Sequence, residues 1–227
     1  MLFRSNNAEW YNETSGAEDW VKKAAFLATD DSGNYQTAEG THNYCINTHT
    51  QPRGYSGIFP TNPQAGGDKL YAITYNANTT HVLNSINDDR VMVVYSGHGS
   101  QTSWAGPSVS QTNVRNLTGV LSAYVVRHAC VTADFNTAEA FSDTWVIQPN
   151  KGGLVYVGAS DNSYWGEDDR LQRTMFDTLY EDPETYVPSI SEMLYAGLAA
   201  VQQSYPGSAR YYWEEYKIGR ASCRERV

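Results

Sequence analysis

Short apolar segments, rich in β-branched residues, alternate with helical patterns along most of this chain. The apolar segments, each a predicted strand, are residues 24–28, 69–76, 91–96, 123–129 and 152–160, and the helical patterns between them cover 79–88, 112–117 and 137–148. Strands that are apolar on both faces are typical of a parallel sheet that helices cover on both sides. The sequence therefore predicts an α/β sandwich with a mostly parallel central sheet.

The remaining segments complete this pattern. A helical stretch over residues 16–28 is expected to run into the first strand, and the turn-rich, proline-containing segment 29–67 is predicted to be a long irregular loop. Two further helices, over 168–182 and 188–205, are expected to cover the sheet. Because no internal repeat or Pro/Ser-rich linker divides the sequence, we expect one domain.

Composition limits the classes of protein that this chain can represent. Of its 227 residues 41% are hydrophobic, and 16 Lys and Arg against 25 Asp and Glu give a net charge of −9. An acidic chain repels phosphate, so nucleic acid is not an expected partner. No segment approaches the roughly 20 consecutive apolar residues that a membrane helix needs, and Met1 to Arg4 are not followed by the apolar run of a secretory signal.

The last ten residues, IGRASCRERV, look like the translation of a common DNA-sequencing adapter. We therefore expect residues 1–217 to form a domain that is shortened at its C-terminal end, and residues 218–227 to be an artefact. Without this tail the chain has 13 basic and 24 acidic residues, or a net charge of −11. Cys223 belongs to the tail and needs no functional explanation.

Two predicted strands end in residues that carry chemistry. The strand 91–96 is followed by Gly97-His98-Gly99, and the strand 123–129 is followed by Cys130, so consecutive strands deliver an imidazole and a thiol to the same sheet edge. Adjacent strands lie about 4.8 Å apart, which brings such side chains within functional range. Taken alone, a cysteine beside an apolar strand is usually a small buried residue and GHG is often a turn, but the pair together favours nucleophilic catalysis.

This pair supplies the main parts of a thiol-dependent site. A neighbouring histidine promotes formation of the nucleophilic thiolate, and His98 could then protonate the leaving amine and later activate water. The Gly99 N–H has no side chain to shield it, and together with the Cys130 N–H it could form an oxyanion hole. The other cysteine, Cys45, lies in no CxxC or Cys/His cluster, so we expect it to be structural or free.

Four segments closely resemble blocks of the gingipain family of cysteine peptidases. They are YSGHGSQTSW (95–104), HACVTADFNTAEAFSDTWV (128–146), GLVYVGASDNSYW (153–165) and ARYYWEEY (209–216), the last resembling the segment before a family Gly-Asp-Pro motif that the tail replaces. The resemblance extends over residues 17–216. It implies a caspase-like three-layer sandwich and hydrolysis of peptide bonds through a thioester, with His98 and Cys130 as the dyad and Gly99 in the oxyanion hole.

The resemblance also implies an acidic residue that orients the histidine. The candidates are Glu39, Asp30 and Asp31, all in the predicted loop 29–67, and Glu39, in an EGTH context, is preferred. The alternative is that Glu39 is an ordinary solvated loop carboxylate.

The pocket for the residue before the scissile bond (P1) is expected near the family's pocket tryptophan, Trp165. Asp168 is the first candidate for pairing with a P1 Lys or Arg, and Asp161 lies in the same loop. The alternative is that acidic residues here serve the start of a helix, where they interact favourably with the helix dipole.

The expected function is that of a cysteine endopeptidase that acts on proteins or peptides, and cleavage after Lys or Arg is left open. The protein is expected to be secreted or on the cell surface, with the signal not present in this stretch. A sortase-like transpeptidase on the same fold is the alternative, since both use one thioester. A third possibility is an inactive binding module that presents the 17 Tyr and 6 Trp residues. No cofactor is required; a structural calcium ion would fit the family, although no ligand set can be named.

Overall fold

A six-stranded sheet forms the centre of the molecule. The computed structural model describes residues 19–60, 62–119, 122–149, 151–181 and 186–220. The sheet order is β2-β1-β3-β7-β8-β9, and every neighbouring pair is parallel except β8 and β9. The strands are β1 (Ala24–Ala28), β2 (Asp68–Tyr71), β3 (Met92–Ser96), β7 (Ser122–His128), β8 (Gly153–Ala159) and β9 (Tyr216–Arg220).

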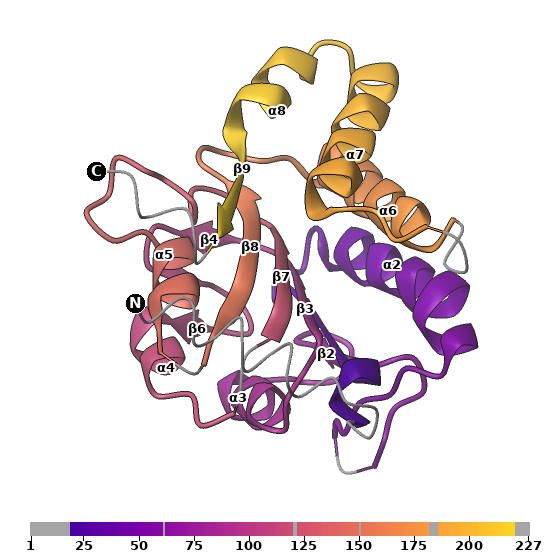
Figure 1. The fold of residues 1–227 in the computed structure, drawn as a ribbon, viewed down its shortest axis with the longest axis vertical. Helices are drawn as coiled ribbons and strands as arrows, with labels where there is room; N and C mark the ends of the chain where they lie inside the picture. The colour runs from indigo at the N-terminus through magenta and orange to yellow at the C-terminus, as the bar shows by residue number, and fades with distance from the viewer. Residues whose placement is uncertain (1–18, 61, 120–121, 150, 182–185, 221–227) are drawn as a thin grey trace.

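Helices cover the sheet on both faces (Figure 1). One face packs against α2 (Tyr35–Cys45), α6 (Trp165–Tyr180) and α7 (Ile190–Ser204), and the other against α3 (Thr79–Asn87), α4 (Gln111–Arg115) and α5 (Phe141–Ile147). Alternate strand residues feed the two hydrophobic cores, as expected for side chains that point to opposite faces of a strand. Val94 and Val126 lie in the first core, whereas Val93 and Val125 lie in the second. The predicted three-layer α/β class is confirmed.

The segment 29–67 is not the irregular loop that its sequence predicts. It contains α2, the π-helix η2 (Ile46–Thr50) and the 3-10 helix η3 (Gln51–Arg53). The buried side of α2 is largely polar, which hides its helical periodicity: the fully buried His42 contacts the Leu27 carbonyl at 2.8 Å and Gln172 at 2.9 Å. The first of these hydrogen bonds joins the helix to β1 and the second joins it to α6.

Several other boundaries differ from those that the sequence predicts. The expected strand 69–76 ends at Tyr71, and of the expected helix 16–28 the structure describes only the 3-10 turn η1 (Asp19–Lys22), residues 16–18 lying outside the described part. Unpredicted elements are a small antiparallel sheet of β4 (Gly99–Ser100), β5 (Ser103–Trp104) and β6 (Val109–Ser110), the helix α8 (Ala209–Glu215), and β9.

The tail begins inside the sheet. Residues 218–220 form the end of β9, where Ile218 pairs with Val157 of β8. Residues 221–227 lie outside the described part of the chain.

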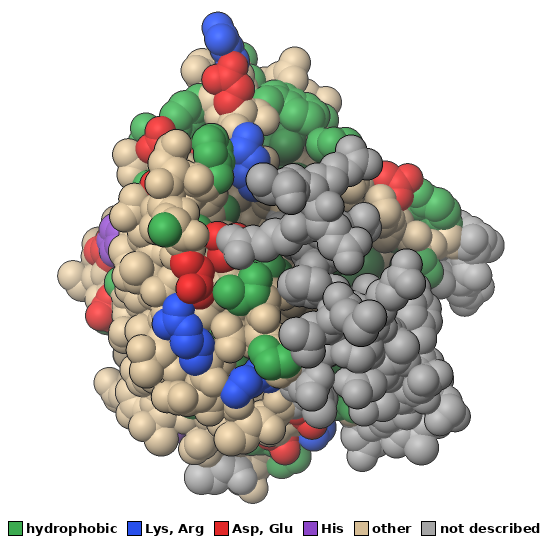
Figure 2. All heavy atoms as spheres, turned by 60° about the vertical axis from the view of Figure 1, so that its left-hand side comes forward, with side chains coloured by type: hydrophobic (Ala, Val, Ile, Leu, Met, Phe, Trp, Pro, Cys, Tyr) green, Lys and Arg blue, Asp and Glu red, His purple; other side chains and the backbone are tan. Residues whose placement is uncertain are grey.

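Most of the described surface in Figure 2 is backbone or uncharged polar side chains, with acidic and basic groups scattered in small clusters. This agrees with a composition in which only 18% of residues are charged. Within the described residues, no helix combines the length and the apolar character needed to cross a bilayer.

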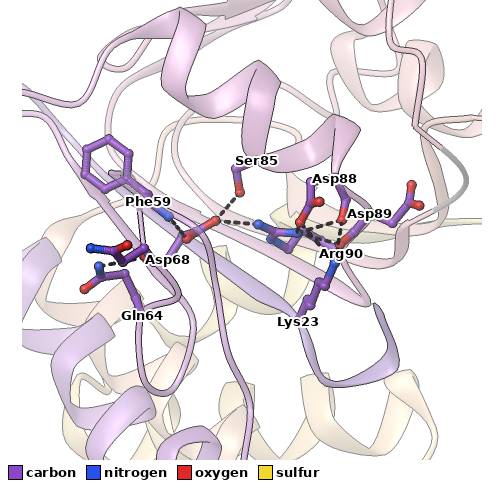
Figure 3. A network of polar contacts seen from close by, with 9 residues as sticks. Lys23, Phe59, Gln64, Asp68, Ser85, Asp88, Asp89 and Arg90 are labelled. Carbon is purple, nitrogen blue, oxygen red and sulfur yellow. Dashed lines mark hydrogen bonds and ion pairs between the residues drawn. The ribbon is translucent and has the colours of Figure 1, made fainter. Parts of the chain in front are cut away.

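A buried ion network ties β2 to the segment that precedes β3 (Figure 3). The Arg90 guanidinium donates to the Asp68 and Asp88 carboxylates at 2.8 Å each, and both Arg90 and Asp68 are fully buried. Asp68 also accepts hydrogen bonds from the Phe59 N–H and the Ser85 hydroxyl. Each buried charge in this network therefore has partners, as charges in a protein interior require.

Candidate active site

His98 follows β3 and stands at the carboxyl end of the sheet. Its carbonyl accepts hydrogen bonds from the Tyr95 hydroxyl (2.7 Å) and the Ala105 N–H (2.9 Å), so the backbone at this position is held on two sides. A Cβ atom at Gly97 would lie 2.4 Å from the Tyr95 hydroxyl oxygen, which explains a glycine before the histidine. The imidazole itself is about half exposed.

Asp31 is the carboxylate that contacts this imidazole. The distance between His98 Nε2 and Asp31 Oδ2 is 3.0 Å. Asp31 lies just after β1, where the Asn34 amide and the Gly33 N–H donate to it, and these bonds, followed by the bond to His98, lower the pKa of Asp31 to about 2. Asp31 is therefore ionised at physiological pH and can hold a proton on Nε2, which leaves Nδ1 as the basic nitrogen of a neutral imidazole.

Glu39, the carboxylate preferred from the sequence, lies elsewhere. It is on α2, is largely buried, and accepts hydrogen bonds from the backbone N–H and the hydroxyl of Thr74. The placement of Glu39 in a loop is wrong, because the segment is helical and directs this side chain toward the turn after β2. Of the two other candidates, Asp31 contacts His98, whereas Asp30 packs against Gly106.

Cys130 follows β7 at a strained turn. The next residue, Val131, has a φ of 49°, a left-handed conformation that is uncommon for a β-branched residue and that concentrates at functional sites. The Val131 N–H is held by the Asp161 carbonyl at 2.9 Å. The thiol faces the same loop: the Ser163 N–H lies 3.4 Å from Sγ, and Sγ lies 3.7 Å from the Ser163 carbonyl.

Gly99 and Cys130 approach each other closely across the sheet edge. A Cβ atom at Gly99 would lie 2.8 Å from the Cys130 carbonyl oxygen and 2.8 Å from the Thr132 methyl group. Only a glycine fits this position. The two backbone segments whose N–H groups are the expected oxyanion-hole donors are thus neighbours.

Trp165 connects the imidazole to the loop that holds the thiol. It begins α6 two residues after Ser163, and its ring lies edge-on to the His98 ring with 5.5 Å between the centroids. One short segment, Ser163 to Trp165, therefore contacts both Cys130 and His98. The structure brings these predicted site residues together at one edge of the sheet.

Asp168 lies beneath this segment, in the first turn of α6. It is only 5% exposed and accepts hydrogen bonds from the hydroxyls of Tyr212 (3.1 Å) and Tyr216 (2.6 Å). Burial raises the pKa of Asp168 to about 6, against the lowering effect of its hydrogen bonds. The Tyr212 hydroxyl is also bonded to the backbone of Tyr164. The exposed residue Asp161, by contrast, reaches the site through its carbonyl, by the bond to Val131.

Several buried polar and charged groups around the site were not predicted from the sequence. Glu215 at the end of α8 is 2% exposed, and its carboxylate oxygens have no hydrogen-bond partner among the described residues. Arg127 on β7 is fully buried three residues before the nucleophile. The unpredicted junction of α8 and β9 supplies Tyr212, Glu215 and Tyr216. A charged residue inside the otherwise apolar strand AYVVRHA was the available signal for Arg127.

Within the described residues, no group of three or more His, Cys, Asp or Glu side chains could hold a metal ion.

The fold and the site, a parallel α/β sandwich with a thiol, an imidazole and a carboxylate at one sheet edge, have the geometry of a cysteine peptidase. The chain belongs to peptidase family C25, whose family model matches residues 5–218. The family resemblance seen in the sequence is thereby confirmed.

Curated relatives include two Lys-gingipains of Porphyromonas gingivalis, from HG66 and W83. The first is 29% identical and the second 26% identical over 229 residues, which cover 88% of this chain and 12% of each relative. The chain thus spans about an eighth of the length of these relatives.

Solved structures share the fold. One, described as the structure of a protease, has a TM-score of 0.76 and 21% identity and covers 96% of this chain and 51% of that one. The Arg-specific cysteine proteinase gingipain R has a TM-score of 0.69 and 20% identity, with 90% and 48% covered.

Proposed function

We propose that this protein is a cysteine endopeptidase that hydrolyses peptide bonds through a thioester on Cys130. The observation that carries the proposal is the single segment from Ser163 to Trp165, which contacts both the Cys130 thiol and the His98 ring. Membership of peptidase family C25 supports it.

The acylation step follows from the hydrogen bonds. With its Nε2 proton held by Asp31 at 3.0 Å, His98 accepts the thiol proton on Nδ1. Cys130 Sγ then attacks the substrate carbonyl carbon, and the resulting oxyanion is stabilised by the N–H groups of Gly99 and Cys130. When the C–N bond breaks, His98 returns the proton to the leaving amine, and the acyl group stays on sulfur.

Water completes the reaction. His98 takes a proton from a water molecule, the hydroxide attacks the thioester carbonyl, and the thiolate leaves and is reprotonated. An amine in place of water would give the transpeptidation that is the alternative on this fold. The relatives described above are gingipains and proteinases, so hydrolysis is the reaction we propose.

We further propose that Asp168 favours a cationic P1 side chain. Its carboxylate is buried under the Ser163–Trp165 segment, where little water competes for an ammonium or guanidinium group. The named relatives, a Lys-gingipain and an Arg-specific gingipain, are consistent with a basic P1 residue. We expect a secreted or cell-surface location on the basis of the family resemblance.

A peptide library analysed by mass spectrometry tests this function. The expected result is cleavage after Lys or Arg, with addition of water only, even when an amine acceptor is present. Amine-ligated products would favour the transpeptidase, and cleavage without preference for a basic residue would remove the role of Asp168. Absence of any turnover would overturn the proposal.

A further inference from the structure

Within the described part of the chain, the guanidinium groups of Arg90 and Arg127 are both fully buried, but their partners differ. Arg90 is surrounded by the carboxylates of Asp68 and Asp88 (Figure 3). Arg127, equally buried, forms no ion pair with any described residue, and its Nε and Nη1 atoms have no acceptor. An uncompensated buried charge is strongly destabilising. Arg90 has two carboxylate partners, whereas Arg127 lies beside the nucleophile with no carboxylate in ion-pair contact among the described residues, which indicates a use for its charge.

Among the described residues, Arg127 makes one side-chain hydrogen bond, and it points to the active site. Its Nη2 atom donates to the Cys130 carbonyl at 3.0 Å. A Cβ atom at Gly99 would lie 3.2 Å from Nη2, and one at Gly158 would lie 3.2 Å from Nη1. The guanidinium therefore lies directly behind the two backbone segments that are expected to supply the oxyanion-hole N–H groups.

The charge of Arg127 acts on groups around the site. It opposes the burial-driven rise in the pKa of Asp168 and of Glu215, and it has the same effect on the buried tyrosines Tyr95 and Tyr156. Its field therefore extends across the sheet edge. In such a low-dielectric region a fixed positive charge stabilises nearby negative charge more strongly than it would in water.

From this geometry we propose that Arg127 is an electrostatic positioning residue, whose buried charge stabilises the negative charge that forms on Cys130 and on the substrate oxyanion. The inference rests on the proposed thiol mechanism and deepens it. Arg127 does not touch the reacting atoms; it acts through the Cys130 peptide and through its field. A purely structural role, in which the guanidinium only props up the Cys130 carbonyl, is the competing explanation.

Three substitutions separate charge from hydrogen bonding. Arg127→Lys keeps the charge, Arg127→Gln keeps a donor for the Cys130 carbonyl but no charge, and Arg127→Met keeps neither. The control is Arg115→Met, which removes the same charge from an exposed side chain that pairs with Glu139. The full chain is used throughout.

Two reaction rates measure the effect of the Arg127 charge on Cys130. The first is the alkylation of Cys130 by the neutral reagent iodoacetamide at pH 7, followed by peptide mapping, and the second is hydrolysis of a fluorogenic peptide with Lys or Arg at P1. We expect Arg127→Gln and Arg127→Met to slow alkylation and lower kcat by about tenfold, with KM within about twofold, whereas Arg127→Lys and Arg115→Met stay within about threefold of the parent.

Two results would contradict a catalytic role for the Arg127 charge. If Arg127→Gln reacts as fast as the parent, the hydrogen bond alone suffices and the charge has no role. If Arg127→Lys is as slow as Arg127→Met, geometry rather than charge is responsible. Alkylation needs no substrate, so it tests Arg127 even if no peptide is hydrolysed, and in that case only the proposed function fails.

Discussion

Asp31 and Glu39 offer the sharpest comparison of single residues, because only one of the two carboxylates contacts the imidazole. We expect Asp31→Asn to lower kcat by at least ~10-fold with little change in KM, because the imidazole loses the group that orients it and stabilises its charged form. Glu39→Gln should leave kcat unchanged, since Glu39 bonds to Thr74. Steady-state kinetics on a P1 Lys or Arg peptide measures both.

The opposite ranking would contradict this assignment. If Glu39→Gln lowered kcat and Asp31→Asn did not, Glu39 would be the orienting carboxylate and the contact between Asp31 and His98 would have no catalytic role.

Asp168 should make peptide recognition depend on pH. Because its pKa is raised to about 6, it is neutral below that pH and ionised above it, so it attracts a cationic P1 side chain only above about pH 6. We expect kcat/KM for a P1 Lys peptide to fall as the pH decreases through 6, in addition to any effect shared by all substrates. A neutral P1 peptide is the matched control.

Substitution of Asp168 by Asn should remove this difference between the two peptides. If the ratio of kcat/KM for the charged and the neutral peptide did not change with pH in the parent, the carboxylate would not contact the P1 cation.

The placement of His98 and Cys130 at one sheet edge follows from the sequence, whereas their surroundings do not. His98 and Cys130 could be found because each directly follows a short apolar strand, so the topology places them. Asp31 could not be chosen over Glu39, because that choice depends on how the segment after β1 folds. Glu215 and Arg127 were missed, since burial of a charged side chain depends on tertiary packing.

Among the elements, β2 and the turn before β3 depend on the ion network around Arg90 (Figure 3). We expect Asp68→Ala to lower the free energy of unfolding by ~3–5 kcal/mol, because it leaves the Arg90 charge without its buried partner. Asp88→Ala, which removes a carboxylate that is 39% exposed, should cost only ~1 kcal/mol or less. Urea denaturation with an unchanged m-value measures both, and equal costs would contradict the network's role.

The strands were easier to predict than α2. β1, β3, β7 and β8 are largely apolar segments flanked by polar breaks, and the ends of each lie within one residue of its predicted range. α2 carries a buried histidine and a central Gly40 instead of an apolar stripe, so its periodicity is hidden. Elements that rely on polar tertiary contacts lie beyond pattern-based prediction.

At the scale of the whole molecule, Glu215 makes a contribution to stability that decreases as the pH rises. Burial raises the pKa of Glu215 to about 9, so the folded chain binds a proton that the unfolded chain releases near pH 4.5. Stability from this group is therefore complete below about pH 4.5 and is lost as the pH rises toward 9, at up to ~1.4 kcal/mol per pH unit.

The isosteric variant Glu215→Gln tests this slope. We expect it to unfold at a higher temperature than the parent at pH 8 and at nearly the same temperature at pH 4, as measured by calorimetry. An equal difference at both pH values would show that Glu215 is not held as the neutral acid.

Covalent labelling shows whether Cys130 is the nucleophile of a peptidase. The parent, Cys130→Ala and Cys45→Ala are each treated with a peptidyl acyloxymethyl ketone ending in Lys or Arg, followed by intact mass measurement and peptide mapping. We predict one label per chain on Cys130 in the parent and in Cys45→Ala, with labelling and hydrolysis both lost in Cys130→Ala. Hydrolysis that survives Cys130→Ala would contradict the assignment of Cys130 as the nucleophile. A parent that is neither labelled at Cys130 nor able to hydrolyse peptides would favour an inactive binding module.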